Sequence, residues 1–242
     1  MILAAIRSVI TYVAVSLYLL IAAPIGILLA TIFRWKGILY ILGHGGVRLG
    51  LALVGIKVRI AGVEHIPLDR AAVYCANHQS NVDPPVLFTA LHPRMHIVYK
   101  KEIDKVPLLG TVFQHGGFVA IERQNKEAAM RSLEAGARSI RAGNSFLIFP
   151  EGTRSKTAEL LPFKKGGFLM ALKAQAPIVP VAISGGRDAM QRGSRIVRPV
   201  TISIRVGEPI ETTGMATSDR DGLIARVRER IEALLAEGPV LD

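Results

Sequence analysis

Two long apolar stretches open the chain. From Ser8 to Phe33 no side chain is charged, and as a helix this stretch would extend about 39 Å at about 1.5 Å per residue. That length exceeds the hydrocarbon core of a bilayer, which is about 30 Å thick. A second apolar stretch, Gly37 to Ile56, contains only His44 and Arg48 as ionisable groups. The pattern predicts a membrane-associated helical segment over residues 1–56.

A secretory signal peptide is the competing interpretation of the first stretch. The apolar stretch is longer than the apolar region of a signal peptide, and no clear small-x-small cleavage site precedes a polar mature sequence. Basic residues follow both apolar stretches, and the first acidic residue is Glu64, so the positive-inside rule favours a cytoplasmic location for the remainder. The number of crossings stays open, because the second stretch could span, re-enter or lie in the interface.

From Lys57 onward, short β-branched stretches alternate with helical ones. This alternation predicts one α/β domain over residues 57–242, with a mixed sheet flanked by helices. Asn125 and Gly143 are placed to cap the start and the end of one helix. The predicted strands cover 57–60, 71–76, 96–99, 118–121, 145–149, 178–183 and 200–206, and the clearest predicted helices cover 84–91, 126–142, 166–176 and 221–237.

The formal charge of +11 bears on the partners of the chain. Clustered Lys and Arg attract nucleic-acid phosphates and anionic lipid surfaces alike. Because a nucleic-acid-binding domain has no need for a lipid-soluble N-terminus, the charge favours a membrane surface and phosphate-bearing substrates, with no nucleic-acid partner. The single cysteine, Cys75, excludes an intrachain disulfide and a cysteine-rich metal site, which favours a reducing environment.

The first candidate for chemistry is the segment NHQSNVD at 77–83, between a predicted strand and a predicted helix. Asp83 suits the N-cap and Pro84 the first helical position, so the chain reverses direction over these residues. The reversal can bring the Asp83 carboxylate to one ring nitrogen of His78 and hold the other nitrogen as the acceptor that a general base requires. The alternative is a capping aspartate beside an ordinary loop histidine.

A second candidate, FPEGTRS at 149–155, follows an apolar strand, where ligands bind in α/β sheets. Gly152 permits close backbone approach, and Arg154 offers a planar fork for a phosphate. Glu151 could accept a hydrogen bond from a substrate hydroxyl. The alternative is a surface turn with an ion pair inside the loop.

Two further segments complete the set of candidates. The strand GGFVAIER at 116–123 ends in Arg123, a possible second phosphate ligand, and Lys164 and Lys165 could extend the basic patch. A solvated strand end and a solvated helix start are the alternatives for these cations. The segment IVPVAIS at 178–184 has the pattern of a buried strand that shapes a pocket wall.

Together the four segments resemble the motif blocks of the glycerolipid acyltransferase family, in the same order along the chain. The likeness covers roughly residues 57–210. It departs from the family at Ala120, where a bulky residue is more common, and at Glu122, which replaces the commoner aspartate. These departures leave the detailed shape of the acceptor site open.

The resemblance implies transfer of a fatty acyl group from an acyl thioester to the sn-2 hydroxyl of lysophosphatidic acid, giving phosphatidic acid. In this reaction His78, oriented by Asp83, takes the hydroxyl proton as the oxygen attacks the thioester carbonyl. Arg123 and Arg154 would bind the phosphate, and Glu151 the glycerol backbone. The implied substrate-binding set also includes Gly152, Thr153, Lys164 and Lys165.

The resemblance also implies acyl-coenzyme A or acyl carrier protein as the donor, with no cofactor and no metal. The location implied is a bacterial-type inner membrane, with the catalytic domain facing the cytoplasm. Alternatives are another lysolipid or glycerol-3-phosphate as acceptor, or a non-catalytic lipid-binding protein. A lipid esterase lacks support, because the chain has no GxSxG nucleophile elbow. A covalent route through Cys75 competes with a buried structural cysteine, which the strand alternation favours.

Overall fold

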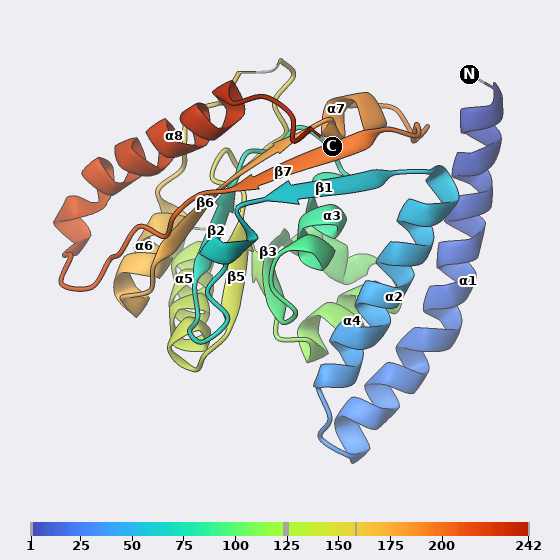
Figure 1. Ribbon diagram of the computed structural model, residues 1–242. Coiled ribbons are helices and arrows are strands. Elements are labelled where there is room, and N and C mark those ends of the chain that lie inside the picture. The colour runs from blue at the N-terminus through green and yellow to red at the C-terminus, as the bar shows by residue number, and fades with distance from the viewer. Residues whose placement is uncertain (1, 123–125, 158, 242) are drawn as a thin grey trace.

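The computed structural model describes residues 2–122, 126–157 and 159–241. The chain begins with two helices that lie side by side, α1 (Ile2–Ile32) and α2 (Gly37–Val54), along one edge of the molecule (Figure 1). Both are long and apolar enough to cross a membrane. The predicted N-terminal helical segment is therefore confirmed over residues 2–32 and 37–54.

The contact between α1 and α2 is close because glycine stands at several facing positions. A methyl group on Gly26 would lie 3.0 Å from side chains of Leu39 and Leu42, and one on Gly46 would meet the ring of Tyr18. On its outer side α1 exposes a row of large apolar side chains, which supports membrane association. These exposed residues include Leu3, Ile6, Val9, Ile10, Leu17, Leu20, Ile21, Leu28 and Ile32.

Within the described residues, seven strands form a mixed sheet in the order β1-β7-β6-β2-β5-β3-β4. Neighbouring strands run parallel except for the antiparallel β6–β7 pair. The predicted mixed sheet is confirmed, and each predicted strand is found within two residues of its expected bounds. The strands are β1 (Lys57–Ala61), β2 (Val73–Ala76), β3 (Met95–Lys100), β4 (Val119–Ile121), β5 (Ser145–Ile148), β6 (Ile178–Ser184) and β7 (Thr201–Val206).

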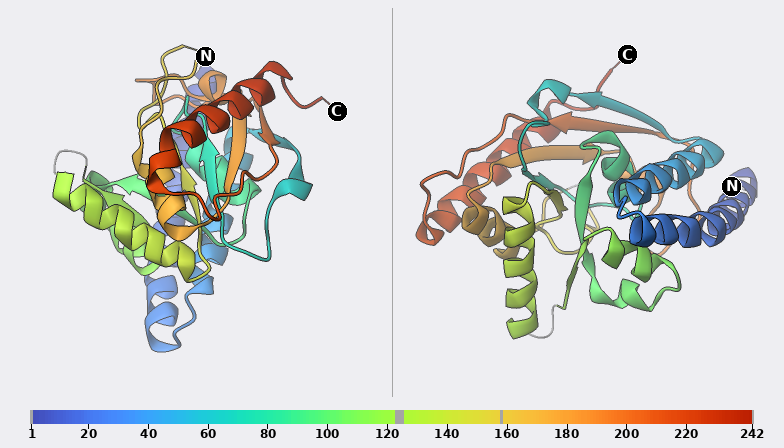
Figure 2. Two further views of the ribbon diagram at one scale, coloured as in Figure 1. Left: turned by 90° about the vertical axis from the view of Figure 1, so that its left-hand side faces the viewer. Right: turned by 90° about the horizontal axis from the view of Figure 1, so that it is seen from below.

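Helices cover both faces of this sheet (Figures 1 and 2), and the alternation along β2 shows which face is which. Tyr74 and Ala76 join a core cluster with α2 and α3, whereas Val73 and Cys75 join a cluster with α5, α6 and α8. The four predicted helices are confirmed, and the short α4 and α7 are additional. These helices are α3 (Asp83–Ala90), α4 (Leu109–His115), α5 (Lys126–Arg141), α6 (Gly166–Ala174), α7 (Gly186–Ala189) and α8 (Arg220–Ala236).

A glycine in the left-handed conformation follows helix α5. Gly143 follows the helix with a φ of 93°, in the left-handed region that favours glycine after a helix, as predicted. The predicted cap Asn125 lies outside the described residues. Short 3₁₀ segments occur at Val63–His65, Lys101–Lys105 and Thr217–Asp219.

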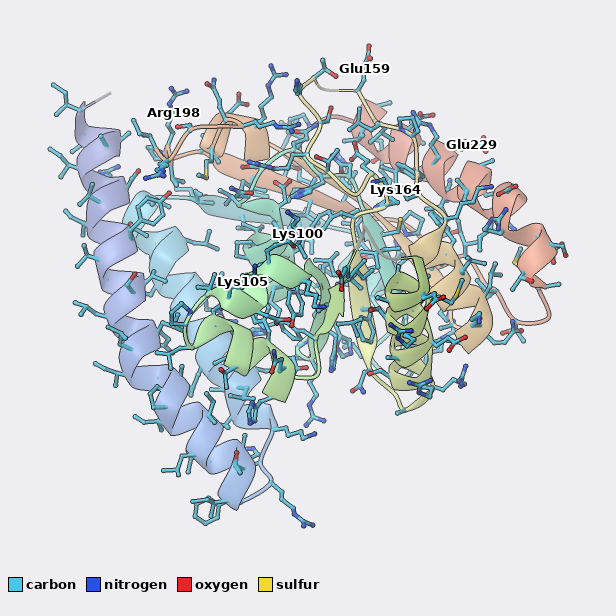
Figure 3. All side chains as sticks on the ribbon, turned by 180° about the vertical axis from the view of Figure 1, so that it is seen from behind. Lys100, Lys105, Glu159, Lys164, Arg198 and Glu229 are labelled. Atoms are coloured by element: carbon cyan, nitrogen blue, oxygen red, sulfur yellow. The ribbon has the colours of Figure 1, made fainter. Side chains whose placement is uncertain are left out.

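The helical pair packs onto the rest of the chain through polar and apolar contacts. The Tyr40 hydroxyl donates to the Gly116 carbonyl at 2.8 Å and lies 3.0 Å from Nε2 of His96. At the other end of the pair, Ser8 Oγ accepts a hydrogen bond from the Val197 amide at 2.8 Å. Figure 3 shows Arg198, the next residue, beside the N-terminal half of α1. The helices are therefore part of the folded core.

Candidate active site

The register of the sheet brings the first, third and fourth blocks together. Strands β2 and β5 are parallel neighbours, with Cys75 opposite Ile148. Strand β6 lies on the other side of β2 and runs parallel to it. Because the carboxyl ends of parallel neighbours meet at one edge of a sheet, the segments 77–83, 149–155 and 184–190 emerge next to one another (Figure 1).

The predicted pairing of His78 with Asp83 is confirmed. Nδ1 of His78 lies 3.0 Å from Oδ2 of Asp83, whose side chain is completely buried. The same oxygen accepts the backbone amides of Gln79 and Ser80, each at 2.7 Å. With Nδ1–H donating to the carboxylate, Nε2 is left as an acceptor. The His78 side chain is 15% exposed, so a substrate hydroxyl can reach it.

The predicted N-cap role of Asp83 is wrong. Helix α3 already includes Asp83, follows Val82 and has no side-chain cap bond. The carboxylate turns back to the amides that precede it, and a group engaged there is not available to cap the helix. Its other oxygen, Oδ1, has no hydrogen-bond partner among the described residues. Gly186 packs against this oxygen so closely that a methyl group there would overlap it.

Glu151 holds the backbone of the histidine. Only 2% of its surface is exposed, and its two oxygens accept the amides of His78 at 2.7 Å and Leu161 at 2.9 Å. The amide of Ser155 in turn donates to the His78 carbonyl at 2.8 Å. Burial raises the pKa of Glu151, against the opposing effect of the two amides. Its predicted contact with the glycerol backbone stays a prediction.

Two further side chains fix the histidine, although the sequence reasoning assigned them no role. The ring of Phe149 stacks on the imidazole of His78, with centroids 4.2 Å apart. Asn77 binds the backbone of Ile183 through both ends of its amide, at 2.9 and 2.8 Å, and so joins the first block to β6. Both residues stand inside the quoted motif blocks, which was the available signal.

Four of the predicted substrate-binding residues, Gly152, Thr153, Arg154 and Lys164, lie on the segment between β5 and α6. Gly152 has a φ of 65°, and the aliphatic chain of Lys164 lies over it (Figure 3 labels Lys164). Thr153 is exposed and Arg154 is half-buried, both on the loop that carries Glu151.

The two remaining predicted cations are Lys165 and Arg123. Lys165 faces helix α8, where its Nζ lies 3.6 Å from Asp221. Arg123 lies outside the described residues. The binding roles of Gly152, Thr153, Arg154, Lys164, Lys165 and Arg123 stay predictions.

Cys75 is buried, as the strand alternation predicts. It faces the α5, α6 and α8 side of the sheet, and burial raises the pKa of its thiol far above the usual value. A thiol in this state is a poor nucleophile, which argues against the covalent route. In the described part of the chain, no three His, Cys, Asp or Glu side chains gather as a metal site requires.

Comparison with known proteins identifies the family. A family model described as acyltransferase matches residues 57–184. The 1-acyl-sn-glycerol-3-phosphate acyltransferase of Limnanthes douglasii is 32% identical over 223 residues, covering 90% of this chain and 79% of that protein. The chain belongs to the glycerolipid acyltransferase family. The beta form of the same enzyme from Homo sapiens is 32% identical over 171 residues, covering 70% of this acyltransferase and 62% of the human protein.

The fold agrees with this membership. A crystal structure of the 1-acyl-sn-glycerophosphate (LPA) acyltransferase from Thermotoga maritima superimposes with a TM-score of 0.84 at 22% identity, covering 98% of this chain and 97% of that one. The acyltransferase therefore shares this architecture over almost its whole length, including the paired N-terminal helices.

Proposed function

We propose that this acyltransferase moves a fatty acyl group from an acyl thioester to the sn-2 hydroxyl of lysophosphatidic acid, giving phosphatidic acid. The observation that carries the proposal is the His78 imidazole, bonded to the buried Asp83 through Nδ1 and reachable by substrate. The names of the relatives supply the acceptor, since both the plant and the human protein are 1-acyl-sn-glycerol-3-phosphate acyltransferases.

In the proposed reaction, Nε2 of His78 accepts the proton of the acceptor hydroxyl as its oxygen attacks the thioester carbonyl. The tetrahedral intermediate then expels the thiolate, which takes the proton back from the imidazolium, so the products are phosphatidic acid and a free thiol. Asp83 stabilises the imidazolium between these steps. General-base catalysis of this kind accelerates a reaction by about 10²- to 10⁴-fold.

The acceptor phosphate is proposed to bind the cations of the loop after β5, Arg154 and Lys164, together with Arg123. Arginine suits this role because its planar fork makes paired hydrogen bonds to phosphate oxygens. The chemistry needs no cofactor or metal ion beyond the acyl thioester itself. Acyl-coenzyme A is the proposed donor, with acyl carrier protein as the alternative.

The proposed location is a bacterial-type inner membrane, with the catalytic domain on the cytoplasmic side. The exposed apolar side chains of α1 support the membrane, and the basic residues after both apolar stretches support the orientation. In sealed inverted vesicles, added protease is expected to cleave the domain from residue 57 onward. Protection of that domain would place it on the other side.

Turnover by the detergent-purified enzyme tests the reaction. With lysophosphatidic acid and oleoyl-coenzyme A, the wild type is expected to form phosphatidic acid, and His78→Ala to be at least about 10²-fold slower because its general base is gone. His115→Ala is the matched control, since His115 is an exposed histidine whose Nδ1 lies 2.9 Å from the Thr111 carbonyl of its own helix. Absence of product from the wild type with both acyl-coenzyme A and acyl carrier protein would contradict the proposal.

A comparison of acceptors tests the specificity. Lysophosphatidic acid is expected to give a higher kcat/KM than glycerol-3-phosphate or lysophosphatidylcholine, offered at equal donor concentration. A preference for either competitor would reassign the acceptor while leaving the acyl transfer in place.

A further inference from the structure

A basic cavity of about 480 Å³ opens beside the catalytic loop. Gln79, the neighbour of His78, lines one wall. The other walls come from two segments far apart in the sequence, one after β5 and one at α7. These lining residues are Ser155, Lys156, Arg187, Gln191 and Arg192.

The charge of this basic cavity is not neutralised from within the described chain. Three of its lining residues, Lys156, Arg187 and Arg192, are cationic and exposed, and no described carboxylate lines it or pairs with them. Arg192 donates through Nη1 to the Arg154 carbonyl at 2.9 Å, which fixes one cation in place. Three neighbouring positive charges repel one another, so the cavity favours a ligand with several negative charges.

The wall that carries Arg187 is tied to the catalytic loop. Ser80 Oγ donates to the Met190 carbonyl at 2.9 Å, at the end of α7. At the start of the same helix, Gly186 packs against the Asp83 carboxylate. The cavity wall at α7 is therefore held against the segment that carries His78.

We propose that the basic cavity binds the phosphate groups of an acyl-coenzyme A donor, an assignment that rests on the proposed acyl transfer. Coenzyme A carries a pyrophosphate and a 3′-phosphate, and three cations with polar neighbours match this set. The pantetheine arm separates the phosphates from the thioester, so phosphates in the cavity leave the thioester free to reach Nε2 of His78.

The lysophosphatidic acid acceptor fits the basic cavity less well. It carries a single phosphate, and the loop after β5 already offers Arg154 and Lys164 for it. Acyl carrier protein also presents a single phosphate on its prosthetic group and docks through an acidic protein surface. The three cations of the cavity therefore favour the nucleotide of coenzyme A, which carries several phosphate charges.

Kinetics of a double variant, Lys156→Gln with Arg187→Gln, test the assignment. Its KM for oleoyl-coenzyme A is expected to rise at least tenfold, with kcat and the KM for lysophosphatidic acid unchanged within twofold. Arg226→Gln, which removes an exposed arginine from α8, is the matched control and should match the wild type. Arg192 is left intact because it holds the backbone of the acceptor loop.

Three outcomes of these kinetics would overturn the assignment. The KM for lysophosphatidic acid could rise in place of that for oleoyl-coenzyme A, which would make the cavity the acceptor site. The KM for the acylated acyl carrier protein could rise while the KM for oleoyl-coenzyme A stays unchanged. The third outcome is that none of these KM values changes, which would leave the cavity without a substrate role.

Calorimetric titration with free coenzyme A separates this assignment from the proposed reaction, because binding needs no turnover. The Kd for coenzyme A is expected to be at least tenfold higher in the double variant than in the wild type. For the wild type, the Kd for dephospho-coenzyme A is expected to be higher than the Kd for coenzyme A. A wild type that forms no phosphatidic acid yet shows these shifts would contradict the reaction alone. Equal Kd values for wild type and double variant would contradict the cavity assignment.

Discussion

Two buried carboxylates, Asp83 and Glu151, both bind His78, but at different atoms. Asp83 meets ring nitrogen Nδ1, whereas Glu151 accepts the backbone amide of the same residue. The first contact decides which ring nitrogen carries the proton, and the second decides where the loop stands. Two carboxylates buried beside the same histidine can therefore differ in what they hold, since one orients the ring and the other anchors the backbone.

The variant Asp83→Asn should give the largest effect. The amide keeps the size of the side chain but loses the charge that stabilises the imidazolium, and its NH₂ group can donate to Nδ1 and reverse the tautomer. We expect kcat to fall by roughly 10²- to 10⁴-fold with little change in either KM. Steady-state kinetics of phosphatidic acid formation measure this, and a fall of less than about tenfold would give Asp83 a structural role only.

Gly186→Ala should displace the Asp83 carboxylate without removing it. The added methyl group overlaps Oδ1, so the carboxylate must move away from its place beside His78. A misplacement of this size can lower kcat by about 10²-fold. Gly222→Ala is the control, because a methyl group there on α8 meets no atom within 4 Å. Equal activity of the two alanine variants would show that the carboxylate tolerates the shift.

Glu151→Gln should affect stability more than chemistry. A glutamine keeps one acceptor oxygen, so the amide of either His78 or Leu161 loses its partner in a buried site, and the free energy of unfolding should fall by about 1–3 kcal/mol. Activity should fall by less than in Asp83→Asn. Urea unfolding followed by fluorescence measures the first effect. Unchanged stability with a raised KM for lysophosphatidic acid would instead show direct binding of the substrate by Glu151.

The pH dependence of stability should give the smallest effect and the sharpest distinction. Burial raises the pKa of Glu151 above its ordinary value of 4.5, so at a pH between the unfolded and folded pKa values the folded state holds a proton that the unfolded state releases. The stabilisation from this protonation is complete below pH 4.5 and is lost as the pH rises through the folded-state pKa. As the pH is raised from 4, the free energy of unfolding of the wild type should fall relative to that of Glu151→Gln. A constant difference would contradict the raised pKa.

The sheet and the main helices could be predicted from the sequence because each leaves a local pattern of apolar residues. Strand β6 is a continuous apolar stretch, as a strand covered on both faces must be, and α5 follows a helical period. The helices α4 and α7 span seven and four residues, which is too short to show a period. The pairing of His78 with Asp83 could also be predicted, because the two residues are only five positions apart in the sequence.

Contacts that depend on the register of the sheet could not be predicted. Glu151 and His78 lie 73 residues apart and meet because β2 and β5 are neighbours. The sequence therefore suggested Glu151 as a substrate ligand and gave no indication of its backbone contacts. The approach of Gly186 to Asp83 and the gathering of Lys156 with Arg187 also arise only in the folded chain.

The Tyr40 hydroxyl has a practical consequence for handling the protein. It projects from an apolar helix, donates to the carbonyl of Gly116 in the second motif block and lies within hydrogen-bond distance of the buried His96. A fragment trimmed before residue 57 would remove this hydroxyl contact from His96 and uncover the core that Val54 and Ile56 complete. A soluble version is better sought by replacing the exposed apolar side chains of α1 than by shortening the chain.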